Sequence, residues 1–260
     1  MELKGAAAIV TGGARGIGRG IAYELAREGA RLALADLPAT AAERDETIAG
    51  IKALGSEAIG IDCDVRDYVQ VQALVQTTID AFGAVDVLVN NAGVIKLGPA
   101  VAFSEEDWDL IMDVNVKGTF LCTKAVIPHM TSRQQGRIIN LSSIAGKRGR
   151  PFASCYATSK WAVIGFTQSM AYELAPANIT VNAICPGEVD TYMWREVILP
   201  LAAAGAGTSK DEAWQAMLQR DVPLKRPQTP EDIGQAAVYL CKADNVTGIA
   251  LNVSGGTEMN

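Results

Sequence analysis

Three polar side chains, Ser143, Tyr156 and Lys160, combine residue type and spacing in a way that points to chemistry. Tyr156 and Lys160 are four residues apart, so on a helix they share one face, and the phenol and the ammonium can point into the same space. Ser143 precedes the tyrosine by thirteen residues and can reach that space from the end of a neighbouring strand. Such a trio can exchange a proton with a substrate hydroxyl.

A glycine-rich segment directly follows the first apolar run and reads Thr11-Gly12-Gly13-Ala14-Arg15-Gly16-Ile17-Gly18. Gly12 permits a tight turn, while Gly16 and Gly18 let the backbone approach a pyrophosphate and the helix approach the sheet. The N-terminus of that helix offers N–H groups and a positive dipole to phosphates. A phosphate-binding turn together with a tyrosine that handles a proton predicts a nicotinamide-dependent oxidoreductase.

The second predicted strand ends in Asp36, about twenty residues after the glycines, where a carboxylate hydrogen-bonds the adenosine ribose. This carboxylate would also repel a 2′-phosphate, which favours NAD over NADP. Arg15 argues the other way, because a guanidinium at the glycine turn could reach that phosphate. We expect the carboxylate to decide the preference, since it faces the ribose directly.

An alternating series of strands and helices must position these residues, and most of the short apolar runs are continuous, as in a parallel sheet covered on both faces. The predicted strands are Ala6–Thr11, Arg31–Asp36, Glu57–Ile61, Val85–Asn90, Gly136–Leu141, Ile179–Ile184 and Ile249–Val253. The predicted helices are Gly16–Glu28, Ala41–Leu54, Asp67–Phe82, Glu105–Met130, Ser154–Ala175 and Pro230–Lys242. This alternation predicts an α/β fold, a doubly wound sheet in a single domain over residues 1–260.

One segment, residues 188–226, lacks any strand signal and interrupts the alternation. Two amphipathic stretches, Met193–Leu201 and Asp211–Arg220, flank a run of alanine and glycine from Ala202 to Gly207. Because such small residues can absorb backbone changes, we expect this segment to form a mobile lid over the substrate.

The composition narrows the class of protein. A net charge of −6 argues against nucleic-acid or anionic-membrane partners, which favour a basic surface. No apolar run approaches the roughly 20 residues needed to span a bilayer, and the first strand leaves no room for a signal peptide. Five scattered cysteines without a CxxC pair fit a reduced, cytoplasmic protein. His129 is the only histidine, which excludes a metal site built on histidine clusters.

Several motifs in order make the whole chain resemble the short-chain dehydrogenase/reductase family of the single-domain type. The glycine turn matches that family, Asn90-Asn91-Ala92-Gly93 follows the fourth strand, and Pro186-Gly187 follows the sixth. The resemblance implies a Rossmann-type sheet of about seven strands in the order 3-2-1-4-5-6-7. It also implies hydride transfer between nicotinamide and a secondary alcohol or ketone.

The same resemblance implies which residues hold the dinucleotide. Asp64 matches the acidic residue that contacts the adenine, and Thr191 matches the residue that meets the nicotinamide carboxamide. The full implied set is Gly12, Arg15, Gly16, Ile17, Gly18, Asp36, Asp64, Val65, Asn91, Ala92, Gly93, Tyr156, Lys160, Pro186, Gly187, Val189 and Thr191.

For catalysis, the resemblance assigns the proton transfer to Tyr156 and makes Ser143 the partner of the reacting oxygen. A free phenol titrates near ~10, and we expect the Lys160 ammonium and the positive ring of the cofactor to lower that pKa. Asn115 matches the asparagine that links the lysine to solvent through a water, and a neutral hydrogen bond between helices is the alternative for it. Ser142 is a rival to Ser143 that composition cannot separate, although the family's spacing selects Ser143.

The signal for the substrate is weaker. Candidate residues that contact it are Ser143, Ala145, Glu188, Met193 and Trp194, and Ile95 and Lys96 are expected in the same pocket. A carboxylate at Glu188 would suit a polyol, because it accepts hydrogen bonds from neighbouring hydroxyls. The expected activity is therefore an NAD-dependent sugar-alcohol or other secondary-alcohol dehydrogenase, with a 3-oxoacyl-thioester reductase as the alternative.

Two further expectations concern the class and assembly of the protein. A dinucleotide sensor without turnover would be expected to have lost the tyrosine, the lysine or the serine, and all three are present. The two longest predicted helices carry apolar residues on more than one face, such as Trp161, Phe166 and Met170. Exposed apolar stripes usually find partners, so we expect a homotetramer.

Overall fold

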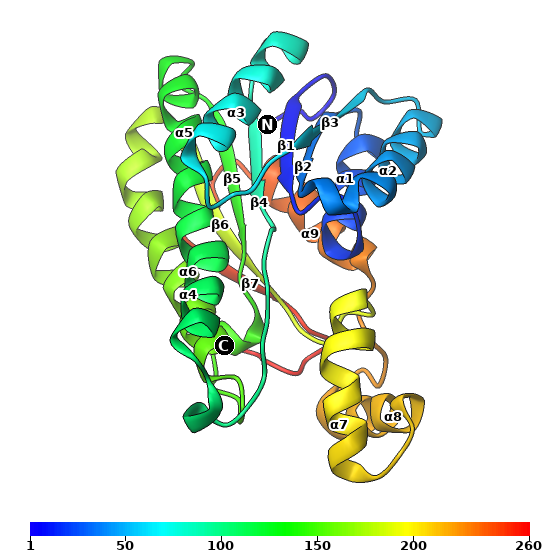
Figure 1. The fold of residues 1–260 in the computed structure, drawn as a ribbon. Coiled ribbons are helices and arrows are strands. Elements are labelled where there is room, and N and C mark those ends of the chain that lie inside the picture. The colour runs from blue at the N-terminus through cyan, green and yellow to red at the C-terminus, as the bar shows by residue number, and fades with distance from the viewer.

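A single seven-stranded sheet forms the centre of the computed structural model, which describes residues 1–260 (Figure 1). Every strand pairing is parallel and the strand order is 3-2-1-4-5-6-7, which confirms the predicted fold class. The strands are β1 (Ala7–Thr11), β2 (Arg31–Asp36), β3 (Ala58–Asp62), β4 (Val87–Asn90), β5 (Gly136–Leu141), β6 (Ile179–Pro186) and β7 (Ala250–Val253).

Helices cover both faces of this sheet (Figure 1). Their bounds are α1 (Gly16–Arg27), α2 (Ala41–Ala53), α3 (Tyr68–Phe82), α4 (Glu105–Met112), α5 (Gly118–Ser132), α6 (Ser154–Leu174), α7 (Leu199–Ala206), α8 (Lys210–Asp221) and α9 (Pro230–Lys242). Helices α1 and α9 contribute to the core on one face, whereas α3, α5 and α6 contribute to the core on the other. None of the helices is both long enough and apolar enough to cross a membrane.

The continuous apolar runs in the sequence follow from this two-sided burial. In β1, Ala8 and Val10 point into the core shared with α1 and α9, while Ala7 and Ile9 point into the core on the opposite face. All five residues of β1 are buried, and so are all six residues of β5. A strand with apolar layers on both sides has no face to spare for polar residues.

The helix predicted over Glu105–Met130 is two helices, α4 and α5, joined by a π-helical stretch over Asp113–Lys117. Asn115 lies in this stretch, and its side chain exchanges two hydrogen bonds with the backbone of Val94. The wider turn therefore coincides with a side chain that ties this helix pair to the loop after β4. Single π-helical turns of this kind are frequent at functional sites.

The segment expected to form a lid, residues 188–226, contains two helices and is called the lid below. A π-helical turn over Met193–Ile198 continues into α7, which contains most of the alanine-rich run, and Gly207 ends it with φ +66°. This outcome follows from the high helix propensity of alanine. Helices α7 and α8 form a hairpin that projects beyond the carboxyl ends of the strands (Figure 1). The hairpin has its own apolar cluster, made of Leu199, Trp214, Leu218 and Val222.

Backbone hydrogen bonds join the segment where the lid begins to the segment where it ends. Val189 and Gln228 form an isolated parallel bridge, in which Gln228 N donates to Glu188 O and Asp190 N donates to Gln228 O at 2.9 and 3.0 Å. The lid therefore leaves and re-enters the body of the protein at one point.

The close packing of α1 on α9 supplies a test of the fold. A Cβ atom on Gly20 would collide with the carbonyl group of Pro230 at the start of α9. We expect Gly20→Ala to lower the free energy of unfolding by about 1–3 kcal/mol, because the two helices must move apart. Urea denaturation followed by circular dichroism measures the change.

A matched glycine-to-alanine change provides the control. Gly205 lies in α7, and a Cβ atom there would meet nothing within 4 Å. Gly205→Ala should stabilise the protein by roughly 0.5–1 kcal/mol through helix propensity alone. If both variants shifted the urea midpoint equally, the close helix contact at Gly20 would be contradicted.

Candidate active site

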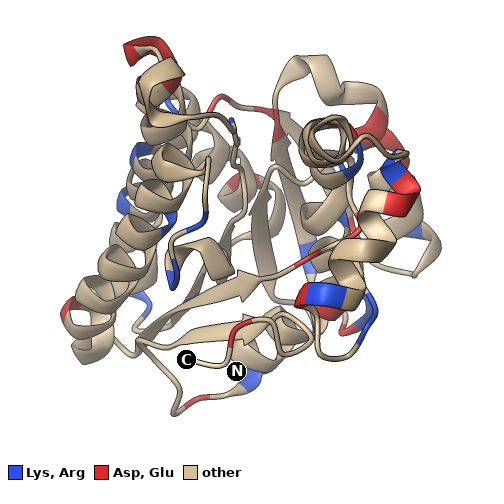
Figure 2. Cartoon of the chain, turned by 90° about the horizontal axis from the view of Figure 1, so that it is seen from below, with Lys and Arg blue, Asp and Glu red and all other residues tan.

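The carboxyl ends of the strands carry most of the site residues expected from the sequence. The glycine turn follows β1, Asn91 follows β4, Ser143 follows β5, and Pro186 ends β6. Strands β2 and β4 flank β1, so the strand order reverses beside the glycine turn, which is where doubly wound sheets bind ligands. The view onto this end shows segments of both charge signs interspersed around the periphery, with no basic stripe (Figure 2).

The glycine turn has a shape that only glycine permits at its key positions. Gly12 and Gly16 have φ values of +63° and +56°, in the left-handed region that favours glycine. A Cβ atom on Gly18 would collide with the carbonyl oxygen of Gly12. The backbone therefore carries no side chains at these glycines where the turn enters α1. A pyrophosphate could approach it there and accept hydrogen bonds from the N–H groups of that helix end.

Hydrogen bonds from β4 hold the turn in place. Asn91 Nδ2 donates to the carbonyl oxygens of Thr11 and Gly12, both at 2.9 Å. In return, Thr11 Oγ1 accepts from the backbone N–H groups of Asn91 and Ala92 at 3.0 and 3.1 Å. The Asn-Asn-Ala-Gly segment thus braces the glycine turn from the neighbouring strand.

Asp36 lies against the same turn. Its Oδ2 atom accepts a hydrogen bond from Ala14 N at 3.0 Å, and its Oδ1 atom accepts one from Leu37 N at 2.9 Å. Each carboxylate oxygen retains a lone pair, so the group can still accept hydrogen bonds from ribose hydroxyls. Arg15, the next residue after Ala14, has its guanidinium 4.2 Å from the ring centroid of Tyr192 and 3.7 Å from Glu43 Oε1.

The remaining residues expected at the dinucleotide lie around this turn or at neighbouring strand ends. Asp64 pairs with Arg66 at 2.6 Å, and hydrogen bonding to that guanidinium lowers the pKa of the carboxyl group. Val65 and Val189 are buried, and Ile17 is half-buried. A Cβ atom on Gly16 would lie 3.6 Å from the Thr191 methyl group, which places the start of the lid next to the glycine turn.

Tyr156 and Lys160 both lie on α6, as the spacing predicts. The Lys160 ammonium is 5.6 Å from the centroid of the Tyr156 ring, and it donates a hydrogen bond of 2.8 Å to Leu141 O at the end of β5. Only 5% of Lys160 is exposed, so its charge is held in a space with little water.

Burial determines the acidity of both groups in the protein itself. It raises the pKa of Tyr156 to about 12, and a hydrogen bond with Ser143 opposes that shift. It also lowers the pKa of Lys160 to about 8. Burial thus shifts both pKa values in the direction that disfavours charge, and the expected lowering of the Tyr156 pKa requires the positive ring of the cofactor as well as Lys160.

The two serines after β5 have different roles. Ser142 is buried, and its hydroxyl donates to Lys160 O at 2.9 Å, which ties the end of β5 to α6. The Ser143 hydroxyl acts on Tyr156 by lowering the pKa of its phenol, and it accepts a hydrogen bond from Ala145 N at 3.1 Å. The geometry therefore favours Ser143 as the partner of the reacting oxygen and gives Ala145 a part in orienting it.

Asn115 is buried and uses its side chain within the protein. Besides Val94, it donates to Ser159 Oγ on α6 at 3.0 Å, which is the neutral contact between helices considered as an alternative. A Cβ atom on Gly93 would lie 3.3 Å from Asn115 Oδ1 and 3.5 Å from Lys160 Nζ. Both Nδ2 hydrogens of Asn115 are therefore used within the protein, whereas Oδ1, which accepts one hydrogen bond, keeps a lone pair close to the lysine.

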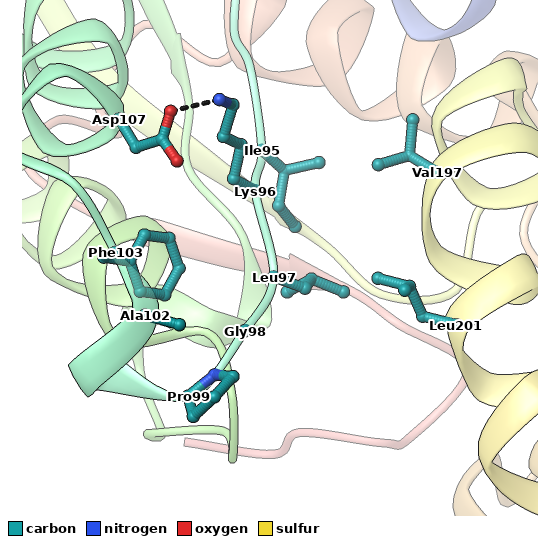
Figure 3. A pocket seen from close by; sticks show the side chains of 10 residues that line it. All are labelled: Ile95, Lys96, Leu97, Gly98, Pro99, Ala102, Phe103, Asp107, Val197 and Leu201. Carbon is teal, nitrogen blue, oxygen red and sulfur yellow. Dashed lines mark hydrogen bonds and ion pairs between the residues drawn. The ribbon is translucent and has the colours of Figure 1, made fainter.

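A cavity of about 390 Å³ lies between the lid and the loop after β4 (Figure 3). Val197 and Leu201 face it from the lid, opposite Ile95 and Leu97, and Lys96 pairs with Asp107 at one side. Six of its ten lining residues are hydrophobic. The complete lining is Ile95, Lys96, Leu97, Gly98, Pro99, Ala102, Phe103, Asp107, Val197 and Leu201.

The lid residues chosen from the sequence do not line this cavity. Trp194 packs on Trp214 with ring centroids 5.3 Å apart and belongs to the lid's own apolar cluster, and Met193 is also absent from the lining. Val197 and Leu201, which sequence reasoning missed, are four residues apart and share a helical face. The four-residue spacing could have indicated this shared face, but the stretch has apolar residues on several faces, so the spacing alone did not single it out.

Glu188 is buried and hydrogen-bonded within the protein. Only 4% of it is exposed, its carboxylate accepts a hydrogen bond from Thr257 Oγ1 at 2.9 Å, and burial raises its pKa. The partner lies far along the chain, in the C-terminal segment. The carboxylate thus attaches that segment to the loop after β6. No group of three or more His, Cys, Asp or Glu side chains is placed to hold a metal ion.

The sheet order, the glycine turn and the Ser143, Tyr156 and Lys160 trio together define a dinucleotide-dependent oxidoreductase. The model of the short-chain dehydrogenase family matches residues 6–200, and the chain belongs to that family. It is accordingly an enzyme that acts on CH–OH groups.

Individual relatives match over almost the whole chain. Galactitol 2-dehydrogenase of Agrobacterium fabrum is 38% identical over 100% of both proteins. The 3-oxoacyl-(acyl-carrier-protein) reductase of Staphylococcus epidermidis is 37% identical over 97% of this chain and 98% of that protein. The crystal structure of NAD⁺-bound xylitol dehydrogenase superposes with a TM-score of 0.92 at 32% identity, covering 98% of this chain and 100% of the other.

The different contacts of the two serines can be tested by removing each hydroxyl. We expect Ser143→Ala to lower kcat by about 10²–10³-fold, as when one hydrogen-bond donor to a developing oxyanion is removed. Ser142→Ala should keep turnover within a few-fold but lower the free energy of unfolding by about 1 kcal/mol, since it leaves Lys160 O without its partner. Steady-state kinetics and urea denaturation report the two effects, and the reverse pattern would exchange the two assignments.

Proposed function

We propose that this enzyme is an NAD-dependent dehydrogenase that interconverts a secondary alcohol and a ketone, with a sugar alcohol or another small polyol as substrate. The observation that carries the proposal is the buried Lys160 and the half-buried Tyr156 beside Ser143 at the carboxyl ends of the strands. The similarity to galactitol 2-dehydrogenase and to NAD⁺-bound xylitol dehydrogenase supports the polyol and the cofactor.

The residues of the site fit a nicotinamide dinucleotide. The bare backbone at Gly12, Gly16 and Gly18 accommodates the pyrophosphate, and Asp36 accepts hydrogen bonds from the ribose. Asp64 and Thr191 extend the contact to the adenine and to the nicotinamide carboxamide. When bound, the nicotinamide supplies the hydride acceptor and a positive charge.

The protein's own residues handle the proton. Tyr156 accepts it from the carbinol through its phenol oxygen, and Ser143 holds the substrate oxygen by a hydrogen bond. The hydrogen bond from Lys160 to Leu141 O holds the ammonium near the Tyr156 ring. Because burial alone raises the tyrosine pKa to about 12, the phenolate depends on nearby positive charge to form at neutral pH.

The apolar cavity, which none of Ser143, Tyr156 and Lys160 lines, is the observation that favours a second candidate substrate. Val197, Leu201 and Leu97 would suit an acyl chain better than a hydroxylated one, and a 3-oxoacyl-carrier reductase is among the relatives. A panel of polyols with NAD, run beside acetoacetyl thioesters with NADPH, separates the two. Activity on polyols alone supports the proposal, whereas reduction of thioesters alone replaces it with the second candidate.

We also propose a homotetramer that functions in the cytoplasm. Trp108, Phe120 and Trp161, on the adjacent helices α4, α5 and α6, are 42%, 45% and 52% exposed, and such apolar exposure usually marks an interface. All five cysteines are free and buried, which suits a reducing compartment. Light scattering that gave a monomer, or cell fractionation that placed the protein elsewhere, would contradict the respective proposal.

Removing the tyrosine hydroxyl tests the chemistry directly. We expect Tyr156→Phe to lower kcat by at least about 10³-fold, because no other group can exchange the proton. The dissociation constant for NADH, measured by fluorescence titration, should change by less than about threefold. Undiminished turnover in this variant would overturn the proposed mechanism.

The cofactor preference is tested at the end of β2. Asp36→Ala should raise the ratio of kcat/KM for NADP over NAD by at least tenfold, a change of about 1.4 kcal/mol, because the charge that repels a 2′-phosphate is lost. Asp62 ends β3 in register with Asp36 and serves as the control. If Asp62→Ala altered the ratio as much, a direct contact of Asp36 with the ribose would be refuted.

A further inference from the structure

Arg15 lies where three elements meet, beside the carboxylate that selects the cofactor. It directly precedes α1, its guanidinium lies over the ring of Tyr192 at the start of the lid, and it pairs with Glu43 in the first turn of α2. Ala14, the residue before it, donates its N–H to Asp36. The guanidinium is thus positioned near the ribose side of the dinucleotide site.

We propose that Glu43 is a specificity-determining residue for the dinucleotide, acting through Arg15. By pairing with the guanidinium, Glu43 keeps it from serving as a counter-charge for a 2′-phosphate. Glu43 also adds a second negative charge on the side where Asp36 already lies. This inference rests on the proposed NAD-dependent function and adds a residue that the glycine motif does not contain.

The other arginines nearby cannot replace Arg15. Arg19 donates hydrogen bonds to Ala14 O, Glu43 O and Thr47 Oγ1 and pairs with Glu46 at 3.0 Å. Arg44 is buried and pairs with Asp62 at 2.7 Å. The Arg15 guanidinium makes no hydrogen bond and the side chain is 44% exposed, so its N–H donors are the ones that a phosphate could engage.

The location of Glu43 suggests that its contribution lies in specificity rather than stability. An exposed ion pair 3.7 Å apart contributes little to folding, so Glu43 variants are expected to fold normally. A carboxylate in the first turn of a helix also occupies the end that would otherwise attract an anion. Removing its charge therefore makes the surroundings of Arg15 more favourable to a phosphate in two ways.

Binding of two nucleotide fragments isolates the 2′-phosphate from the rest of the cofactor. Isothermal titration calorimetry of 2′,5′-ADP and 5′-AMP against the full chain gives the ratio of the two affinities. We expect Glu43→Gln to raise that ratio in favour of 2′,5′-ADP by about fivefold or more, because a like charge beside a multiply charged anion is removed. Glu46→Gln is the matched control, because Glu46 lies one helical turn away and pairs with Arg19 at 3.0 Å instead of Arg15, and it should leave the ratio unchanged.

A second variant tests the route through Arg15. In Glu43→Gln combined with Arg15→Ala, the gain should disappear, because no guanidinium remains to bind the phosphate. A gain that persisted in the double variant, an equal gain in Glu46→Gln, or no gain in Glu43→Gln would each overturn the inference. If the unmodified protein bound neither 5′-AMP nor NADH, the proposed function itself would fail, and the inference would fail with it.

Discussion

The exclusion of water around Lys160 is the constraint on which the rest of the site depends. Its ammonium has one hydrogen bond, to Leu141 O, and lies on the same helix as a phenol that burial makes less acidic. Any charge that forms in this space must therefore be compensated by groups brought close to it rather than by solvent. The contacts of Ser142, Ser143 and Gly93 matter because each fixes a wall of that space.

The parallel sheet satisfies this constraint by bringing distant segments to one edge. Each strand runs in the same direction, so the turns after β1, β4, β5 and β6 lie together although they are far apart in the sequence. The two apolar cores fix the strands from both faces, which leaves the loops at that edge free to carry polar groups. The bracing of the glycine turn by Asn91 is one product of this arrangement.

Most of the fold could be predicted because buried parallel strands have a clear pattern, and the trio on α6 follows from helical spacing. What could not be predicted depended on long-range contacts. The π-helical stretch around Asn115 is stabilised by the backbone of Val94, and the burial of Glu188 depends on Thr257 near the other end of the chain. The orientation of Trp194 could not be predicted either, because several faces of its stretch are apolar, and only its packing on Trp214 shows which face meets the lid's own cluster.

The bridge between Val189 and Gln228 has a consequence for how such enzymes diversify. The segment between these residues starts and ends at this one bridge and has an apolar cluster of its own. The part of it that follows Thr191 and Tyr192 could therefore be replaced by a different insert without changing Ser143, Tyr156 or Lys160. Lengthening such an excursion costs little, because closure entropy grows only slowly with loop size. Selection for a new substrate can then change this segment while the residues that carry out hydride and proton transfer stay the same.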